Sequence, residues 1–120
     1  MPLFAIKEIS DVIAERRLTL DGKPNKNIRV LLGRPQSPDG SDQDHRICPF
    51  QILGIGDEKV RSISGVDDFQ CLQLVQEIIG AYLYSLNRAN AGALRWDGGR
   101  DGDLGFPGPP GIERGFPDEP

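Results

Sequence analysis

The chain has 120 residues, which is enough for one well-packed core and too few for two. It carries 14 basic and 18 acidic residues, a formal net charge of −4, which argues against general binding to a phosphate backbone. No apolar run approaches the roughly 18 residues that span a bilayer, and residues 1–13 are too polar for a signal peptide. We therefore expect a single cytoplasmic domain that makes no membrane contact.

The first two predicted elements form a hairpin. Residues 12–20 alternate apolar and polar side chains, as a half-buried strand does, although Arg16 interrupts the apolar side and is expected at its margin. A second alternating run covers residues 27–33, and turn-forming residues connect the two runs. Arg17 and Arg29 are expected to share the solvent face of this hairpin.

A loop and two further strands are predicted in the middle of the chain. Residues 34–44 are polar and rich in turn formers, so we expect an exposed loop. Residues 46–53 alternate as a third strand, in which Pro49 indicates a sheet edge or a bulge because it has no N–H to donate. Residues 58–64 predict a weaker fourth strand after a glycine-containing turn.

The clearest element is a long amphipathic helix over residues 67–88. Asp67 is the expected N-cap, and Gln70 completes a capping-box-like pair with it. Apolar residues recur at spacings of three and four, a stripe wide enough to face a sheet. The residues of this stripe are Phe69, Leu72, Val75, Ile79, Tyr82, Leu83 and Leu86.

The C-terminal part predicts a short strand or hairpin followed by a tail. Residues 93–96 fit a fifth strand, residues 97–102 a turn, and residues 104–106 a returning segment. From residue 107 the chain is rich in proline and glycine, so residues 107–120 are expected to be irregular or disordered. The fold prediction is thus an α+β domain over residues 1–106: an antiparallel meander of about four strands, then the helix on one face.

Several stretches resemble a known family. They are residues 13–17, 33–35, 65–70, 79–84, 94–96 and 102–107, which together span about three quarters of the chain. Their sequence is similar to a family of short bacterial proteins catalogued only as a domain of unknown function. The resemblance implies a bacterial, cytoplasmic protein, and it implies no activity, cofactor or catalytic residue.

A calcium site is suggested by the sequence at Asp97, Asp101 and Asp103, and less strongly in the acidic loop at Asp39, Asp42 and Asp44. Calcium takes several oxygen ligands on a tightly turning loop, and the aspartate- and glycine-rich segment at residues 97–103 offers both. The spacing differs from that of the twelve-residue calcium loop, and no bidentate glutamate follows it. A plain turn between two short strands is the alternative, and we expect no metal and no cofactor.

Catalytic residues are not expected. His45 is the single histidine and lies in the polar loop without evident partners. Cys48 and Cys71 lack the spacing of a zinc site, and both fall on apolar stripes, which indicates buried free thiols in a reducing compartment.

Interaction residues are predicted at Trp96, Arg95, Arg17 and Arg29. Tryptophan and arginine are favoured at protein interfaces, although Trp96 could equally cover an end of the core. We expect a non-enzymatic protein-interaction module of the accessory or immunity type, whose exposed sheet edge accepts a strand. The expected partner is a protein, and a homo-oligomer formed through an edge strand stays open.

Two other functions stay open. One is a small-ligand binder or enzyme with a pocket between helix and sheet, using Tyr82, Tyr84 and His45 as polar groups. The other is a binder of single-stranded nucleic acid through the basic N-terminal hairpin, which the acidic charge and the lack of aromatic residues there disfavour.

Overall fold

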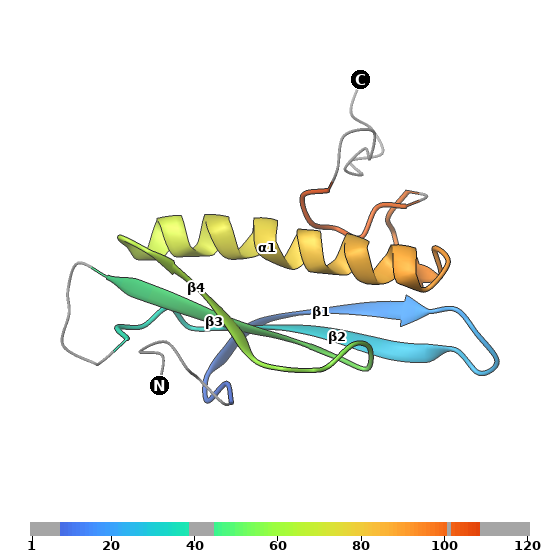
Figure 1. Cartoon of the computed structure of the whole chain (residues 1–120), viewed down its shortest axis with the longest axis horizontal. Helices are drawn as coiled ribbons and strands as arrows, with labels where there is room; N and C mark the ends of the chain where they lie inside the picture. Colours follow the sequence, from blue (N-terminus) through green and yellow to red (C-terminus); the bar gives the residue numbers. More distant parts are fainter. Residues whose placement is uncertain (1–7, 39–44, 101, 109–120) are drawn as a thin grey trace, which may run out of the picture.

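Five strands form one antiparallel sheet with one long helix on one face in the computed structural model, which describes residues 8–38, 45–100 and 102–108 (Figure 1). The strand order is β4-β3-β2-β1-β5, so β1 to β4 form a meander and β5 joins the other side of β1. This confirms the predicted α+β fold with its short C-terminal strand. The elements are β1 Val12–Leu20, β2 Lys26–Gly33, β3 Arg46–Leu53, β4 Arg61–Gly65, α1 Asp68–Ala89 and β5 Leu94–Arg95.

The β1–β2 hairpin forms because its alternating side chains divide between two faces. Leu18 stands opposite Ile28, and both are buried in the core beneath the helix. Arg17 stands opposite Arg29, and both are exposed on the other face, which we call the far face. The predicted hairpin and its solvent face are confirmed.

Strand β3 corrects the prediction for Pro49, because it lies inside the sheet between β2 and β4 and not at an edge. The ladder to β2 ends at the pair Leu32–Phe50, just before Pro49. On its other side Pro49 stands opposite Ser62 of β4. An interior strand tolerates this proline because Pro49 lies just beyond the end of the β2 ladder. An N–H at this position would have no ladder partner, so its absence costs no hydrogen bond.

The loop after β2 is less exposed than expected. Gln36 and Ile47 exchange two backbone hydrogen bonds, of 2.8 and 2.7 Å, and Pro35 is buried. Arg46 fastens this segment by donating to the Pro35 carbonyl oxygen and the Ser37 hydroxyl. The expectation of a wholly exposed loop is therefore wrong for its first part, and residues 39–44 lie outside the described residues.

The fourth strand begins later than predicted. Residues 58–64 were expected, whereas β4 covers Arg61–Gly65. Asp57 accounts for the delay, because its carboxylate accepts hydrogen bonds from the Lys59 amide and the Arg61 guanidinium and so holds the chain in a turn. Two Asp57 oxygens engage Arg61, and this pair holds the pKa of Asp57 well below its usual range.

Helix α1 begins and ends almost where its signals predict. The Asp67 carboxylate accepts a hydrogen bond of 2.8 Å from the Gln70 amide, and the Gln70 side chain accepts one of 2.8 Å from the Val66 amide. Asn90 ends the helix. Among the described residues, no helix is long and apolar enough to cross a membrane.

The buried face of α1 differs from the predicted stripe at its first turn. Phe69 was expected to face the sheet, yet it is 86% exposed. It lies about 80° from the midpoint between Val75 and Leu83, on the flank that Gly80 and Tyr84 occupy in the other half of the helix, where the strap covers it. The buried residues of α1 are Cys71, Val75, Ile79, Gly80, Leu83 and Tyr84.

Helix α1 packs mainly on β3 and β4, and a C-terminal segment covers the β1 side of the same face. We call residues 102–108 the strap; it runs along the C-terminal half of α1 (Figure 1). Leu104 is fully buried, and its amide donates a hydrogen bond of 3.0 Å to the Tyr84 hydroxyl. The strap therefore completes the core instead of forming the predicted hairpin return, and residues 109–120 of the predicted tail lie outside the described residues.

Gly80 permits the close approach of strap and helix. A Cβ atom built at Gly80 would overlap the carbonyl oxygen of Pro107. Glycine is ordinarily unfavourable inside a helix, by roughly 0.5–1 kcal/mol relative to alanine. Its presence in α1 is explained by the strap backbone that crosses it.

Candidate functional site

The four predicted interaction residues lie in two separate places. Arg17 and Arg29 are neighbours on the far face of the hairpin, whereas Arg95 and Trp96 are at the end of β5. Both places border β1, because β5 pairs with its last two residues. Arg95 pairs with Thr19, whose side chain shares the far face with Arg17, so Arg95 lies on the far face as well. Trp96 lies on the helix side, against Arg16.

On the far face, Arg17 and Arg29 share one carboxylate. Arg29 binds both oxygens of Glu15, at 2.9 and 3.1 Å, and Arg17 binds one at 3.2 Å. The hydrogen bond from Arg29 is the main reason that the pKa of Glu15 falls to about 2. Two guanidinium groups and one carboxylate leave this far-face cluster with one net positive charge.

We expect the Glu15 carboxyl to titrate near pH 2 in the folded chain, whereas its ordinary value is 4.5. Because the folded pKa is lowered, the stabilising contribution is complete above pH 4.5 and is lost as the pH falls toward 2. Carbon-detected NMR of the carboxyl carbon measures the midpoint directly. Arg29→Ala should move this midpoint upward more than Arg17→Ala does, and equal midpoints in all three chains would contradict the assignment to Arg29.

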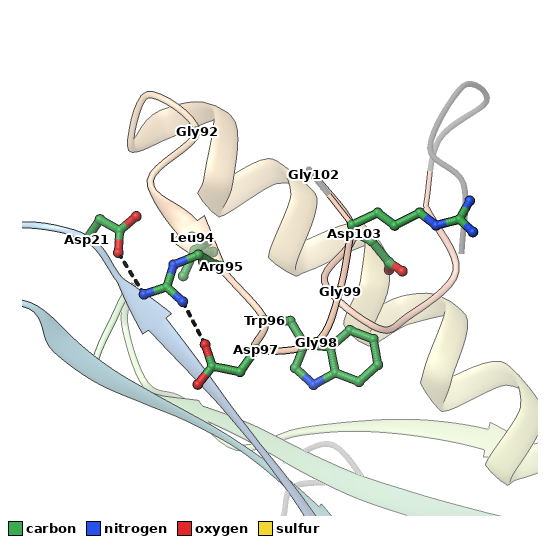
Figure 2. A pocket seen from close by; sticks show the side chains of 11 residues that line it. Asp21, Gly92, Leu94, Arg95, Trp96, Asp97, Gly98, Gly99, Gly102 and Asp103 are labelled. Carbon is green, nitrogen blue, oxygen red and sulfur yellow. Dashed lines mark hydrogen bonds and ion pairs between the residues drawn. The ribbon is translucent and has the colours of Figure 1, made fainter. Parts of the chain in front are cut away.

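Beside β5, Arg95 lies between two carboxylates at a cavity of about 650 Å³ (Figure 2). Its guanidinium contacts Asp21 at 3.2 Å and Asp97 at 2.6 Å. The hydrogen bond with Asp21 is the main cause of the raised pKa of Arg95. The Arg95–Asp21 contact fastens β5 to the end of β1. The charges of Arg95, Asp21 and Asp97 are largely paired with one another.

The predicted calcium ligands serve other contacts where the structure describes them. The Asp97 carboxylate binds Arg95, and the buried Asp103 carboxylate accepts a hydrogen bond of 2.8 Å from the Gly105 amide. Asp101 lies outside the described residues, so its prediction stays untested. Among the residues that the structure describes, no cluster of three or more histidine, cysteine, aspartate or glutamate side chains could hold a metal ion.

Arg16 has a role that the sequence did not reveal. Its guanidinium lies 4.4 Å from the ring centre of Trp96 and 4.8 Å from that of Phe106, and it donates a hydrogen bond to the Gly105 carbonyl. Cations stack on aromatic faces because the ring quadrupole is negative there. Arg16 therefore ties the strap to β1, and Trp96 is half-buried within this contact.

The outer edge of β1 is open along most of its length. Among the described residues, no strand pairs with this edge before Thr19. The Asp21 amide points outward, since it donates to the Ala93 carbonyl beyond β1. Successive residues of a strand direct their backbone groups to alternate sides. The amides and carbonyls of Glu15 and Arg17 therefore point outward as well.

A groove of about 310 Å³ lies next to this open edge, between sheet and helix. We call it the edge groove. Its floor is apolar, and the guanidinium of Arg16 and the amide of Gln76 border it. The lining residues that define it are Ala14, Glu15, Arg16, Val30, Leu32, Gln76, Ile79, Gly105 and Phe106.

Away from the edge groove, a small cavity of about 110 Å³ lies at the helix–sheet seam, lined by residues that include Ile52, Ile55, Tyr82 and Leu86. Tyr82 and Tyr84, predicted as polar groups of a pocket, diverge: Tyr82 packs 6.0 Å from the Phe50 ring, and Tyr84 binds the strap. Cys48 and Cys71 are buried free thiols, as expected, and burial raises the pKa of Cys48 to about 12. These thiols are unsuited to nucleophilic work because they stay protonated near neutral pH.

Comparison with known proteins gives a family but no activity. A family model described as a domain of unknown function, DUF6968, matches residues 14–108. No curated protein matches the chain, and no solved structure matches it. This match confirms the resemblance to a domain of unknown function that the sequence indicated. The matched range contains the open edge of β1 from Ala14 onward, the edge groove and the strap.

Proposed function

The chain belongs to the DUF6968 family, which carries no assigned activity, and from its own geometry we propose a non-enzymatic protein-interaction module. In this proposal the open edge of β1 pairs with an extended segment of a partner protein. The observation that supports it is the outward direction of the Glu15 and Arg17 backbone groups, beside which no strand of the described chain lies. Unpaired edge groups are a template for strand addition.

The edge of β1 suits this role better than the opposite edge of the sheet. β4 has five residues and is packed against α1, whereas β1 has nine and is paired by β5 at its end alone. Short or covered edges discourage pairing, and long open ones permit it. Charged side chains along β1 restrict which strand can pair, so the edge favours a matched partner over indiscriminate association.

A protein partner fits the charges better than nucleic acid. The far-face cluster of Arg17, Arg29 and Glu15 keeps one net positive charge, which can match a single carboxylate but not the continuous charge of a phosphate backbone. The aromatic rings near β1, those of Trp96 and Phe106, are stacked against Arg16. They are therefore poorly placed to stack on bases.

The proposal is tested by comparing Arg17→Pro with Arg17→Ala. Both variants lose the same exposed side chain, but only proline also loses the outward amide. Peptides selected from a displayed library of random linear sequences should bind Arg17→Pro about tenfold more weakly than Arg17→Ala, since one hydrogen bond is lost. Fluorescence anisotropy measures the dissociation constants, and far-UV circular dichroism verifies the fold.

Equal affinity of the two variants for every selected peptide would overturn edge pairing. If Arg17→Pro does not fold, the same hydrogen bonds are tested with wild-type chain and peptides N-methylated on alternate amides. N-methylation on the side that faces β1 should abolish binding, and tolerance of methylation on both sides would equally refute the proposal.

We also propose that the protein acts in a bacterial cytoplasm. The two buried free thiols, Cys48 and Cys71, support a reducing compartment. Fractionation of cells that make the chain from its own gene tests this location. Recovery from the periplasm or the medium would contradict it.

A further inference from the structure

Resting on the proposed function, we propose that the partner segment alternates apolar with polar residues and places an acidic residue opposite Arg17. The apolar side chains would enter the edge groove, and the acidic side chains would lie on the far face beside Arg17 and Arg29. The proposal joins two features on opposite faces of one strand: an apolar hollow and a local excess of positive charge. It identifies the kind of segment that β1 accepts.

The alternation follows from strand geometry. A segment added to the edge of β1 directs successive side chains to opposite faces of the sheet. Residues opposite Ala14 and Arg16 face the helix side, where the edge groove opens, because these two residues pair with Leu32 and Val30 on that face. Residues opposite Glu15 and Arg17 face the far side. One face of the partner therefore meets the groove and the other meets the far-face cluster.

The edge groove fits one or two apolar side chains. Its volume of about 310 Å³ is at the lower end of the range of about 300–1,000 Å³ for small-molecule pockets. Aliphatic and aromatic groups form its floor, namely Val30, Leu32, Ile79 and Phe106. Val30 and Ile79 are already buried, so a leucine or phenylalanine side chain from an added strand would cover mainly Ala14, Leu32 and the exposed part of Phe106.

The far face selects for acidic residues. The side chain of Arg17 is 81% exposed and that of Arg29 is 48% exposed, and both are served by the single carboxylate of Glu15. This cluster is positive although the whole chain carries a net charge of −4. Opposite charges directly across two strands attract, and like charges repel. An acidic residue opposite Arg17 complements the cluster, and a basic residue there would be repelled.

Three synthetic peptides test this specificity against the wild-type chain. The reference peptide is Thr-Glu-Phe-Thr-Leu-Glu-Thr, whose central threonine lies opposite Glu15 when phenylalanine and leucine enter the groove. One control replaces each glutamate by lysine, and another replaces phenylalanine and leucine by serine. We expect each control to bind at least about tenfold more weakly than the reference. Raising the salt concentration should weaken binding of the reference peptide, because its contacts with charged side chains are exposed to solvent.

A change in the protein tests the groove itself. Ala14→Phe places a large ring at the mouth of the edge groove from an exposed strand position, so the fold should persist. The substitution should weaken binding of the reference peptide about tenfold and leave binding of the serine control peptide unchanged. Ala14→Ser is the matched control and should leave both affinities unchanged.

The outcomes separate this inference from the proposed function. If Arg17→Pro binds the selected peptides about tenfold more weakly than Arg17→Ala while the three synthetic peptides bind equally well, the edge pairs strands but the alternation is refuted. If the lysine peptide binds more tightly than the reference, the charge argument is refuted. Loss of reference binding in Ala14→Phe, together with discrimination among the peptides, supports both the groove and the edge.

Discussion

Gly80→Ala should lower the free energy of unfolding by about 2–4 kcal/mol, although alanine favours a helix more than glycine does. The added methyl group would overlap the Pro107 carbonyl, so the strap must move away from α1. Leu104 and Phe106 are 0% and 9% exposed, and burying such side chains contributes about 1.5–3 kcal/mol each. Their partial exposure outweighs a helix-propensity gain of about 1 kcal/mol.

Urea unfolding followed by fluorescence measures this loss, because Trp96 is the single tryptophan and lies against the strap. Its emission should shift to the red in the folded Gly80→Ala chain. Gln73→Ala, at an exposed position of the same helix, is the control and should change the midpoint little. A more stable Gly80→Ala chain with unchanged emission would show that the strap does not cross α1 at this residue.

Arg16→Ala should destabilise the chain by about 2–3 kcal/mol. The change removes two cation–π contacts, of about 0.5–2 kcal/mol each, and a charged hydrogen bond to the Gly105 carbonyl. Arg16 is partly exposed, so the lower part of these ranges applies. Urea unfolding measures the loss, with Trp96 fluorescence again reporting the contact.

Arg16→Lys separates charge from stacking. Lysine keeps the positive charge but lacks the planar group that stacks on two rings. We expect it to recover less than half of the stability lost in Arg16→Ala. Full recovery would show that the charge alone matters and that the two aromatic contacts contribute nothing measurable.

Local patterns in the sequence were enough to predict most of the regular elements. The helix was predicted at 67–88 and is found at Asp68–Ala89, because its cap and its apolar spacing both act within a few residues of each end. The hairpin face that bears Arg17 and Arg29 also follows from period two alone. Residues close in sequence determine both the ends of the helix and the exposed face of the hairpin.

The predictions were wrong where contacts between distant parts of the chain determine the position of a residue. Pro49 predicted an edge strand, but the order of strands depends on the whole sheet, and β3 lies between β2 and β4. The proline is accommodated there because the ladder to β2 ends at the neighbouring residue, Phe50. Phe69 matched the helical stripe by spacing, yet its side chain is exposed because the strap covers this flank of α1 at Gly80 and Tyr84, in the other half of the helix. Hydrophobicity alone did not distinguish these positions.

The candidate site was predicted only in part. Arg17 was chosen for its charge, but its outward amide became evident only once β5 was seen to pair with the last two residues of β1. Arg16 interrupts the apolar face of β1 in the sequence pattern. Its partners, Trp96 and Phe106, are far along the chain, so the pattern alone does not show its contacts. The edge groove likewise combines β1, β2, α1 and the strap, and no local pattern brings these four together.

Amide hydrogen exchange by NMR is the most direct test of edge pairing. In the free chain, the outward amides of Glu15 and Arg17 should exchange quickly, while those of Arg16 and Leu18, which point toward β2, should be protected. Saturation with the reference peptide should slow exchange at Glu15 and Arg17 by about tenfold or more and leave the other two unchanged. Protection of Glu15 and Arg17 already in the free chain, or no slowing on binding, would contradict the account.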